Sequence, residues 1–224
     1  MTPEYKPTRA RSEEKKAMQF ERILEAGKEL FIKKGAAGFS MRILAEKLGM
    51  TKNNLYNYVG SKRELWIAIR NKFYKQYREE NIEVIKNHGT GSNIDLLMKL
   101  FEKFMEFAER DFGVFTMMHA FTSTPTSSKV GEIEKKYREF HLLDGTTNII
   151  QKTIDSGEIG EKDPALVALF LYSLIFGATY IDMNRRIQNP LLENVQLSLK
   201  NVTSADFQEY VLKIIEKLLK NDIL

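Results

Sequence analysis

A single short stretch of this chain concentrates side chains that can recognise a base or a phosphate. Residues 51–58 read Thr-Lys-Asn-Asn-Leu-Tyr-Asn-Tyr. Side-chain amides can form two hydrogen bonds with the edge of adenine, Lys can bond guanine or phosphate, and hydroxyls suit phosphate oxygens. No acidic residue interrupts the stretch, so its composition indicates a surface that contacts nucleic acid.

The flanking sequence predicts two short helices that would hold this stretch at the surface. Ser40 is placed to cap a helix over 41–48 that Gly49 ends, and Thr51 is placed to cap a helix over 52–58. Two short helices joined by a three-residue turn containing Gly form a helix-turn-helix. Its inward face is expected to consist of Ile43, Leu44, Leu48 and Leu55, with the small Ala45 at the helix crossing.

Helical spacing recurs along the rest of the chain, whereas signals for β-strands are nearly absent. A first helix is predicted over 13–34, stopped by Gly35, and a capping box at Ser61–Glu64 predicts the start of a long fourth helix. Further helices are predicted at about 112–121, 129–156 and 163–187, followed by an extended connection over 188–203 and a last helix capped by Ser204. We therefore predict an all-α chain of about nine helices.

From about Phe20 to Phe73 the chain resembles the DNA-binding domain of TetR-type transcriptional repressors. The resemblance covers roughly a quarter of the chain and rests on dense, correctly spaced motifs, Ile23-Leu24-Glu25-Ala26, Leu30-Phe31, Gly38-Phe39-Ser40-Met41-Arg42, Ala45-Glu46-Lys47-Leu48-Gly49-Met50-Thr51-Lys52, Leu55-Tyr56-Asn57-Tyr58 and Ser61-Lys62-Arg63-Glu64-Leu65. It implies an Ω-shaped homodimer with a three-helix N-terminal helix-turn-helix domain, a larger ligand-responsive C-terminal domain and a palindromic operator. The expected division is a flexible basic arm over 1–12, a DNA-binding domain over 13–64 and a ligand-binding and dimerisation domain over 65–224.

The resemblance also implies which residues touch DNA. Asn53, Asn57 and Val59 depart from the residues that are common in the family, and the first two stand where bases are read, which leaves the operator sequence open. The alternative for each side chain is an ordinary surface or capping role. The expected contacts are Ser40, Met41, Arg42, Thr51, Lys52, Asn53, Asn54, Tyr56, Asn57, Tyr58 and Lys62.

Aromatic residues and methionines are concentrated between residues 101 and 140, where the resemblance places an effector pocket. A large apolar cavity there would suit a fatty-acyl, lipid-like or multi-ring ligand. The alternative for any one of these residues is a tightly packed core. The expected pocket residues are Phe101, Phe104, Met105, Phe115, Met118, His119, Tyr137, Phe140, His141 and Phe176.

The resemblance matches Leu166–Ile187 and Phe207–Leu219 to the two helices that pair across the family's dimer. The apolar run over 166–181 contains Ser173, Gly177 and Thr179 and falls short of the ~20 residues that span a bilayer, so we predict a buried helix. Burial within one subunit is the alternative to a dimer. The expected interface residues are Leu169, Tyr172, Phe176, Tyr180, Val211, Ile215 and Leu218.

Positive charge is concentrated near the N-terminus, as in a module that binds a polyanion. Residues 1–64 contain 14 Lys and Arg against 8 Asp and Glu, whereas the other 160 residues contain 20 against 22. Arg9, Arg11, Lys15 and Lys16 are expected to form an arm that reaches the minor groove or flanking phosphates, with a solubilising tail as the alternative.

Several functional classes are not expected. The chain has no cysteine, and no group of His and carboxylates has ligand spacing, so neither a metal nor a cofactor is predicted. The spacing of His141, Asp144 and Thr146 does not build a catalytic triad, and no phosphate-binding glycine loop occurs, so an enzyme is not predicted. Met1–Lys16 is polar, so no secretory signal is expected and the predicted location is the cytoplasm.

These observations predict a ligand-responsive repressor that binds a palindromic operator as a homodimer and is released by a small hydrophobic effector. The expected partners are double-stranded DNA, the effector and a second copy of the chain, and no membrane. The alternative is a transcriptional activator, or a general DNA-binding protein with a vestigial pocket.

Overall fold

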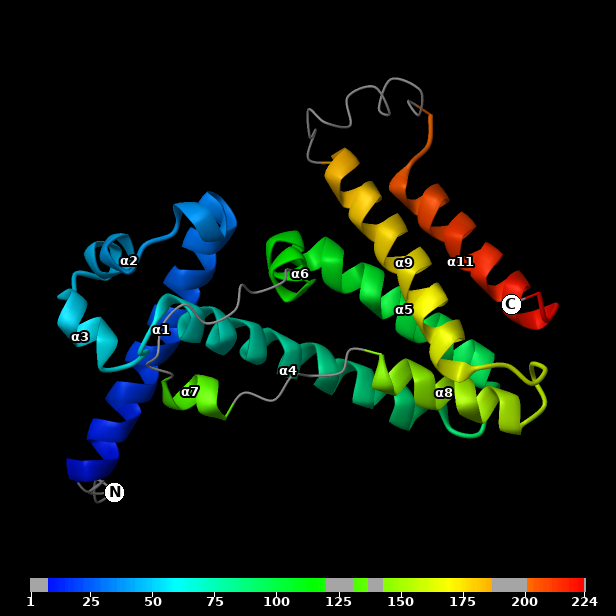
Figure 1. Ribbon diagram of the computed structural model, residues 1–224, viewed down its shortest axis with the longest axis horizontal. Helices are drawn as coiled ribbons and strands as arrows, with labels where there is room; N and C mark the ends of the chain where they lie inside the picture. Colours follow the sequence, from blue (N-terminus) through cyan, green and yellow to red (C-terminus); the bar gives the residue numbers. More distant parts are fainter. Residues whose placement is uncertain (1–7, 120–130, 137–142, 187–200, 224) are drawn as a thin grey trace, which may run out of the picture. The chain divides into compact units, whose positions relative to one another are not determined.

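The computed structural model describes residues 8–119, 131–136, 143–186 and 201–223. These residues form ten helices and no strand, which confirms the all-α prediction. The helices shown in Figure 1 are α1 (Thr8–Gly38), α2 (Met41–Leu48), α3 (Lys52–Tyr56), α4 (Lys62–His88), α5 (Asn93–Arg110), α6 (Phe112–His119), α7 (Glu132–Lys135), α8 (Asp144–Asp155), α9 (Pro164–Arg186) and α11 (Ser204–Lys220).

The described residues form one helix more than the predicted nine, because the prediction of a single helix over 129–156 is wrong. α7 ends at Lys135 and α8 begins at Asp144, with residues 137–142 between them outside the described part of the chain. Gly131, expected inside that helix, instead has an extended backbone (φ −75°, ψ 170°) and precedes α7 as its N-cap. The expected extended connection over 188–203 lies mostly outside the described residues.

α1 is interrupted near its end and begins earlier than expected. Gly35 has φ 64° and ψ 174°, a conformation that breaks the helix and that glycine adopts without a steric penalty. The predicted stop at Gly35 is therefore confirmed as the position of the break. Because α1 begins at Thr8, residues 8–12 are helical, although they belong to the stretch predicted to be a flexible arm.

The chain divides into two compact units. Unit 1 comprises residues 1–75 and 116–138, and unit 2 comprises residues 76–115 and 139–224. Unit 1 is larger than the predicted domain over 13–64, because Leu65, Trp66 and Ile69 of α4 belong to its core, together with Met117 of α6. Ile133 of α7 packs against the same core.

Within unit 1, α1 and α4 pack closely at Gly27. A Cβ atom at this position would lie 3.1 Å from side-chain atoms of both Leu65 and Ile69, so only glycine fits without displacement. The Lys72 ammonium of α4 also donates hydrogen bonds to Glu21 (2.6 Å) and Glu25 (2.8 Å) of α1. These contacts fix α1 and α4, the helices that precede and follow the helix-turn-helix in the sequence.

Unit 2 is built by packing among α5, α8, α9 and α11. Glu158, between α8 and α9, closes the start of α5. Its carboxylate accepts hydrogen bonds from the backbone N–H groups of Asn93 (2.9 Å) and Ile94 (3.2 Å) and from the Ser92 hydroxyl (2.5 Å). The first amides of a helix lack partners within the helix, so Glu158 supplies acceptors that the local sequence does not.

Candidate nucleic-acid interface

α2 has the boundaries that its sequence predicts. The Ser40 hydroxyl accepts a hydrogen bond from the Ile43 N–H (3.2 Å), and Gly49 ends the helix with a left-handed backbone at φ 65°. A side chain at Gly49 would be strained in this conformation. Leu44 and Ala45 are buried, which confirms the predicted inward face at these two positions.

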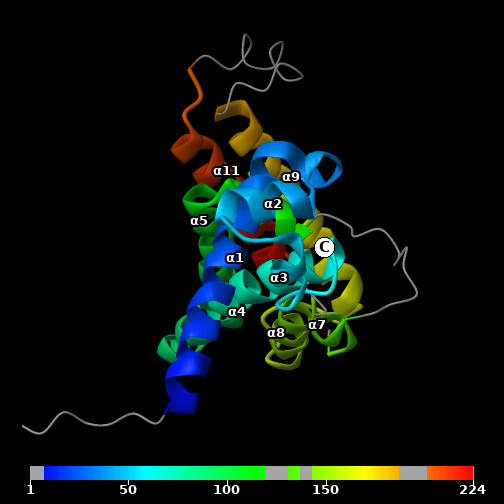
Figure 2. The same cartoon turned by 90° about the vertical axis from the view of Figure 1, so that its left-hand side faces the viewer.

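α3 follows directly and is anchored by one fully buried side chain. The Thr51 hydroxyl accepts a hydrogen bond from the Asn54 N–H (3.2 Å), and Leu55 is 0% exposed. The helix ends at Tyr56, earlier than the predicted Tyr58, and Asn57 serves as its C-cap. Val59 is buried at 1% exposure, as expected for a core position. Figure 2 looks onto α2 and α3.

Most of the predicted DNA contacts lie at the surface of unit 1. Ser40, Tyr58 and Lys62 are half-buried. The prediction that Met41 contacts DNA is wrong, because its apolar side chain is 7% exposed and belongs to the core of unit 1. The exposed members are Arg42, Thr51, Lys52, Asn53, Asn54, Tyr56 and Asn57.

The cations around α3 are positioned by neighbouring groups. The Lys52 ammonium lies 5.6 Å from the centre of the Tyr56 ring. Arg42 is 3.6 Å from Glu46 in an exposed pair. The Lys62 ammonium donates to the Phe39 carbonyl (3.2 Å), which ties the start of α4 to the turn before α2.

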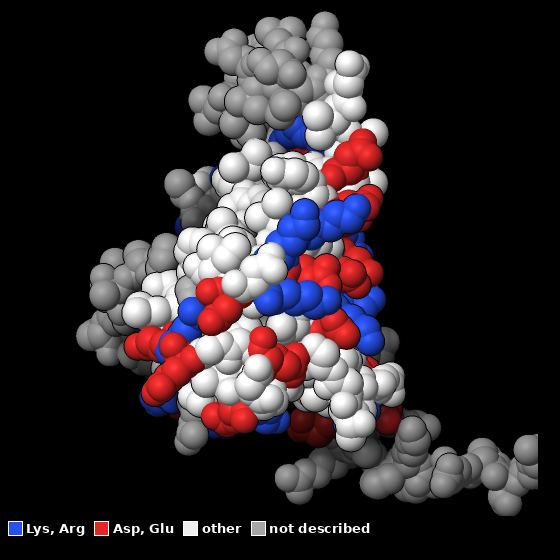
Figure 3. All heavy atoms as spheres, turned by 90° about the vertical axis from the view of Figure 1, so that its right-hand side faces the viewer, with Lys and Arg blue, Asp and Glu red and all other residues white. Residues whose placement is uncertain are grey.

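Carboxylates are absent from the stretch around α3. Residues 47–63 contain no Asp or Glu but include Lys47, Lys52, Lys62 and Arg63. On the side of the molecule shown in Figure 3, by contrast, Lys and Arg are interspersed with Asp and Glu. Ion pairs also occur on α11, where Lys213 lies 2.5 Å from Glu209. The stretch around α3 therefore offers positive charge to a polyanion without a carboxylate of its own.

Ion pairs join α1 to α4 within unit 1. Burial alone would raise the pKa of Glu25, but hydrogen bonds and charge from Lys72 and Lys28 outweigh it and hold that pKa below its usual value. Burial alone would lower the pKa of Lys72, but hydrogen bonds and charge from Glu21 and Glu25 raise it above its usual value. Both groups are therefore charged at neutral pH.

Glu64 has a role that the sequence did not reveal. Ser61 accepts the Glu64 N–H (3.0 Å), as the predicted capping box requires. The Glu64 carboxylate, however, is buried at 2% exposure and accepts N–H groups from Gly60, from Ile133 (2.6 Å) and from Glu134 (3.2 Å). Arg63 pairs with Glu134 beside it. Glu64 thus holds α7 against the turn that joins α3 to α4.

The described residues that were expected to form an effector pocket are divided between the units: Met118 and His119 belong to unit 1, and the others belong to unit 2, where aromatic rings pack against one another. Phe104 and Phe115 have ring centres 5.2 Å apart, and Phe115 stacks on Phe176 at 5.7 Å. His119 and Phe176 are half-buried, and Tyr137, Phe140 and His141 lie outside the described residues. The buried members are Phe101, Phe104, Met105, Phe115 and Met118.

The residues expected at a dimer interface separate into two groups. The prediction that Ile215 lies at the interface is wrong, because its side chain is 1% exposed and packs inside its own subunit. Tyr172, Phe176, Val211 and Leu218 are half-buried, whereas Leu169 (51%) and Tyr180 (44%) are exposed. Further large apolar side chains that are exposed on the same helices are Leu166, Phe170, Ile181, Tyr210 and Ile214.

Burial of α9 within one subunit, which was the alternative to a dimer, is contradicted by the structure. By length and composition the helix could cross a membrane, and only 28% of its most apolar stretch is buried within the chain. Its helical boundaries agree with the prediction, because Asp163 accepts the N–H groups of Ala165 (2.8 Å) and Leu166 (3.2 Å) at its start. α9 therefore leaves a large part of its apolar surface exposed in a single copy of the chain.

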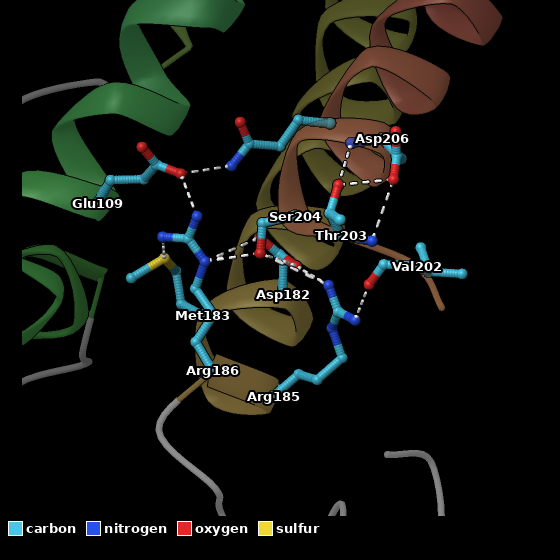
Figure 4. A network of polar contacts seen from close by, with 10 residues as sticks. Glu109, Asp182, Met183, Arg185, Arg186, Val202, Thr203, Ser204 and Asp206 are labelled. Carbon is cyan, nitrogen blue, oxygen red and sulfur yellow. Dashed lines mark hydrogen bonds and ion pairs between the residues drawn. The ribbon is translucent and has the colours of Figure 1, made fainter. Parts of the chain in front are cut away.

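A network of polar contacts joins the C-terminal end of α9 to the start of α11 and to α5 (Figure 4). Asp182, 1% exposed, accepts hydrogen bonds from Arg185 (2.8 Å) and from the Ser204 hydroxyl (3.0 Å). Arg186 reaches Glu109 of α5 (2.8 Å). Thr203, not the predicted Ser204, caps α11, because Asp206 lies three residues after Thr203 and completes a capping box with it.

Among the described residues no three His, Asp or Glu side chains are grouped as metal ligands. The candidate interface consists of amides, hydroxyls and cations, which can form hydrogen bonds to a nucleic acid.

Comparison with known proteins assigns the same region. The model of bacterial regulatory proteins of the tetR family matches residues 23–69. An uncharacterized HTH-type transcriptional regulator of Bacillus subtilis (strain 168), YfiR, is 25% identical over 190 residues, which cover 82% of this chain and 91% of that protein.

Solved structures share the fold over nearly the whole chain. The regulator FadR of Bacillus subtilis in complex with stearoyl-CoA has a TM-score of 0.59 at 18% identity, with 92% of this chain and 100% of that chain covered. The regulator AibR in complex with isovaleryl coenzyme A and operator DNA has a TM-score of 0.55 at 18% identity, with 89% and 96% covered. Together with the helix-turn-helix geometry, the family model over residues 23–69 and the likeness to YfiR support a TetR-family transcriptional regulator, and the solved structures show the same fold.

Proposed function

We propose that the protein is a ligand-responsive repressor that binds a palindromic operator in the cytoplasm as a homodimer. The observation that carries the proposal is the surface of α3. Lys52, Asn53 and Asn57 are exposed on a helix anchored by the fully buried Leu55, and no acid occurs between residues 47 and 63. Such a surface can enter the major groove and form bonds to bases and phosphates.

The exposed apolar side chains of α9 and α11 support a homodimer. Leu166 is 65% exposed, Phe170 45% and Ile181 47%. We propose that a second copy of the chain, rather than a membrane, covers them in a four-helix arrangement. A two-fold axis would then present two copies of α3 to successive major grooves, ~34–36 Å apart.

The effector is proposed to be a small hydrophobic molecule. FadR was solved with stearoyl-CoA and AibR with isovaleryl coenzyme A, so an acyl thioester is the first class to test; lipid-like and multi-ring compounds follow. Such a ligand must bind the conformation that releases DNA more tightly than the conformation that grips it.

A second candidate function is an activator or general DNA-binding protein that has no working pocket. The packing of aromatic rings around Phe115, which is 0% exposed, favours it. The two candidates differ in whether any ligand changes DNA affinity.

Native mass spectrometry and mobility-shift titration test the proposal together. We expect a dimer, a sequence-preferring shift with promoter DNA at moderate salt, and weakening of that shift by acyl-CoA. A monomer, or a shift without sequence preference, would contradict the repressor. A specific shift that no acyl-CoA, lipid or multi-ring compound weakens would favour the second candidate.

A further inference from the structure

Asn53 and Asn57 occupy the part of α3 that points away from the core of unit 1. Leu55 is 0% exposed and defines the inward direction of the helix. Because successive residues are turned by about 100°, positions two before and two after Leu55 each lie about 160° from it. Both asparagines are exposed, and Asn57 keeps right-handed helical angles (φ −72°, ψ −16°) although it is the C-cap. Their side chains are therefore the part of α3 that meets an approaching molecule first.

The side-chain amides of both residues are available for a ligand. Within the described part of the chain, neither Asn53 nor Asn57 forms a side-chain hydrogen bond. Asn57 donates its backbone N–H to the Asn54 carbonyl (3.2 Å). An amide presents an acceptor and a donor side by side. Adenine presents the complementary N6 donor and N7 acceptor in the major groove, whereas guanine presents two acceptors.

The cations that would favour guanine stand elsewhere. α3 contains no Arg. Lys52 lies only about 60° from the direction of Leu55, and its ammonium is 5.6 Å from the centre of the Tyr56 ring. Arg42 lies in α2 and is 3.6 Å from Glu46. The leading edge of α3 is thus formed by amides, and the cations flank it, where phosphates run.

We infer that Asn53 and Asn57 each read an adenine, so that both half-sites of the operator carry adenines at two nearby positions. Residues four apart are separated by about 6 Å along a helix, and bases succeed each other every ~3.4 Å along a strand. The two adenines therefore lie within about two base steps of each other, on either strand. This inference rests on the proposed function, because it names the base content of the DNA that the same surface binds.

Selection from a pool of duplexes with randomised sequence, using the full-length protein at moderate salt, tests the inference. We expect enrichment of sites in which each half carries A·T pairs at two positions within two base steps. Enrichment of half-sites that require G·C at those positions would overturn the inference and leave the proposed function intact. Failure to enrich any sequence would contradict the proposed function itself.

Substitutions then assign the reading to individual residues. With the enriched duplex, Asn53→Ala and Asn57→Ala should each lower affinity by about 5- to 150-fold, the discrimination that a two-bond contact supplies. Replacing one adenine by 7-deazaadenine, which lacks N7, should weaken binding of the unaltered protein. Asn54→Ala is the control for base discrimination and not for affinity, because Asn54 is itself an expected DNA contact but lies about 100° from Leu55, on the flank of the helix.

The decisive readout is loss of discrimination. Each variant should bind its adenine and 7-deazaadenine duplexes equally well, while Asn54→Ala should still distinguish them. If Asn53→Ala and Asn57→Ala both keep the full preference for adenine, the inference is overturned. Fluorescence of Trp66, buried in the core of unit 1, confirms that each variant is folded.

Discussion

Replacing Glu64 by Gln tests whether a buried carboxylate holds α7 on the N-terminal unit. The substitution keeps the size of the side chain but removes its charge and one of its two acceptor oxygens. In the native protein the carboxylate accepts backbone N–H groups from Gly60, Ile133 and Glu134 at 2% exposure. The new NH₂ group would face at least one of these donors.

The expected cost follows from the bonds that are lost. A hydrogen bond to a charged group contributes ~1.5–3 kcal/mol, and a buried donor left without a partner costs ~1–3 kcal/mol. Since Gln retains one oxygen, we expect Glu64→Gln to lower the free energy of unfolding of unit 1 by ~2–4 kcal/mol. Glu46→Gln is the matched control, because Glu46 is 67% exposed and 3.6 Å from Arg42, and such pairs contribute ~0–1 kcal/mol.

Urea denaturation followed by tryptophan fluorescence measures this difference. Trp66 is the only tryptophan of the chain, lies two residues after Glu64 and is 7% exposed, so its emission reports unit 1. Gly131→Ala should destabilise the same contact, because a Cβ atom there would overlap the Glu64 carboxylate. The two substitutions should therefore be less than additive when combined. Equal destabilisation by Glu64→Gln and Glu46→Gln, within ~0.5 kcal/mol, would refute the reasoning.

Three further predictions concern packing and ionisation. Burial alone would raise the pKa of Glu158, but hydrogen bonds from Ser92, Asn93 and Ile94 lower it from 4.5 to about 2. The stability that this carboxylate contributes is therefore present above pH 4.5 and is lost as pH falls toward 2. Denaturation monitored by circular dichroism should show that the stability of Glu158→Gln depends less on pH between these values. Gly27→Val should lower the stability of unit 1 by ~1–3 kcal/mol, measured by Trp66 fluorescence, because its side chain overlaps Leu65 and Ile69; an unchanged transition would show that α1 and α4 are not closely packed. Asp182→Ala should lower the stability of unit 2 by roughly 3 kcal/mol in urea denaturation, because it leaves Arg185, 15% exposed, without its carboxylate; a loss below ~1 kcal/mol would show that the network of Figure 4 contributes little.

The elements that could be predicted from the sequence are those defined by neighbouring residues. α2 has its predicted boundaries because its cap, Ser40, and its end, Gly49, act within a few residues of the helix. The split between α7 and α8 could not be predicted, since the extended backbone of Gly131 accompanies a contact with Glu64 that is distant in the sequence. Local composition at 129–156 favoured one continuous helix instead.

The site shows the same limit. The exposure of Asn53 and Asn57 follows from their positions opposite Leu55 on the helix, so the periodicity was sufficient for these two residues. Met41 and Ile215 were placed on surfaces by resemblance, yet each packs inside its own subunit. Their burial depends on helices that are distant along the chain, which a local pattern does not contain.

The central claim is that α3 is the element that enters DNA, and hydrogen exchange measured by mass spectrometry tests it most directly. The protein would be compared alone and with an excess of an enriched duplex, and peptides covering residues 51–58 would be followed together with peptides from α8. We expect slower exchange over 51–58 when DNA is bound, and unchanged exchange in α8. Protection of α8 with none over 51–58 would contradict the account.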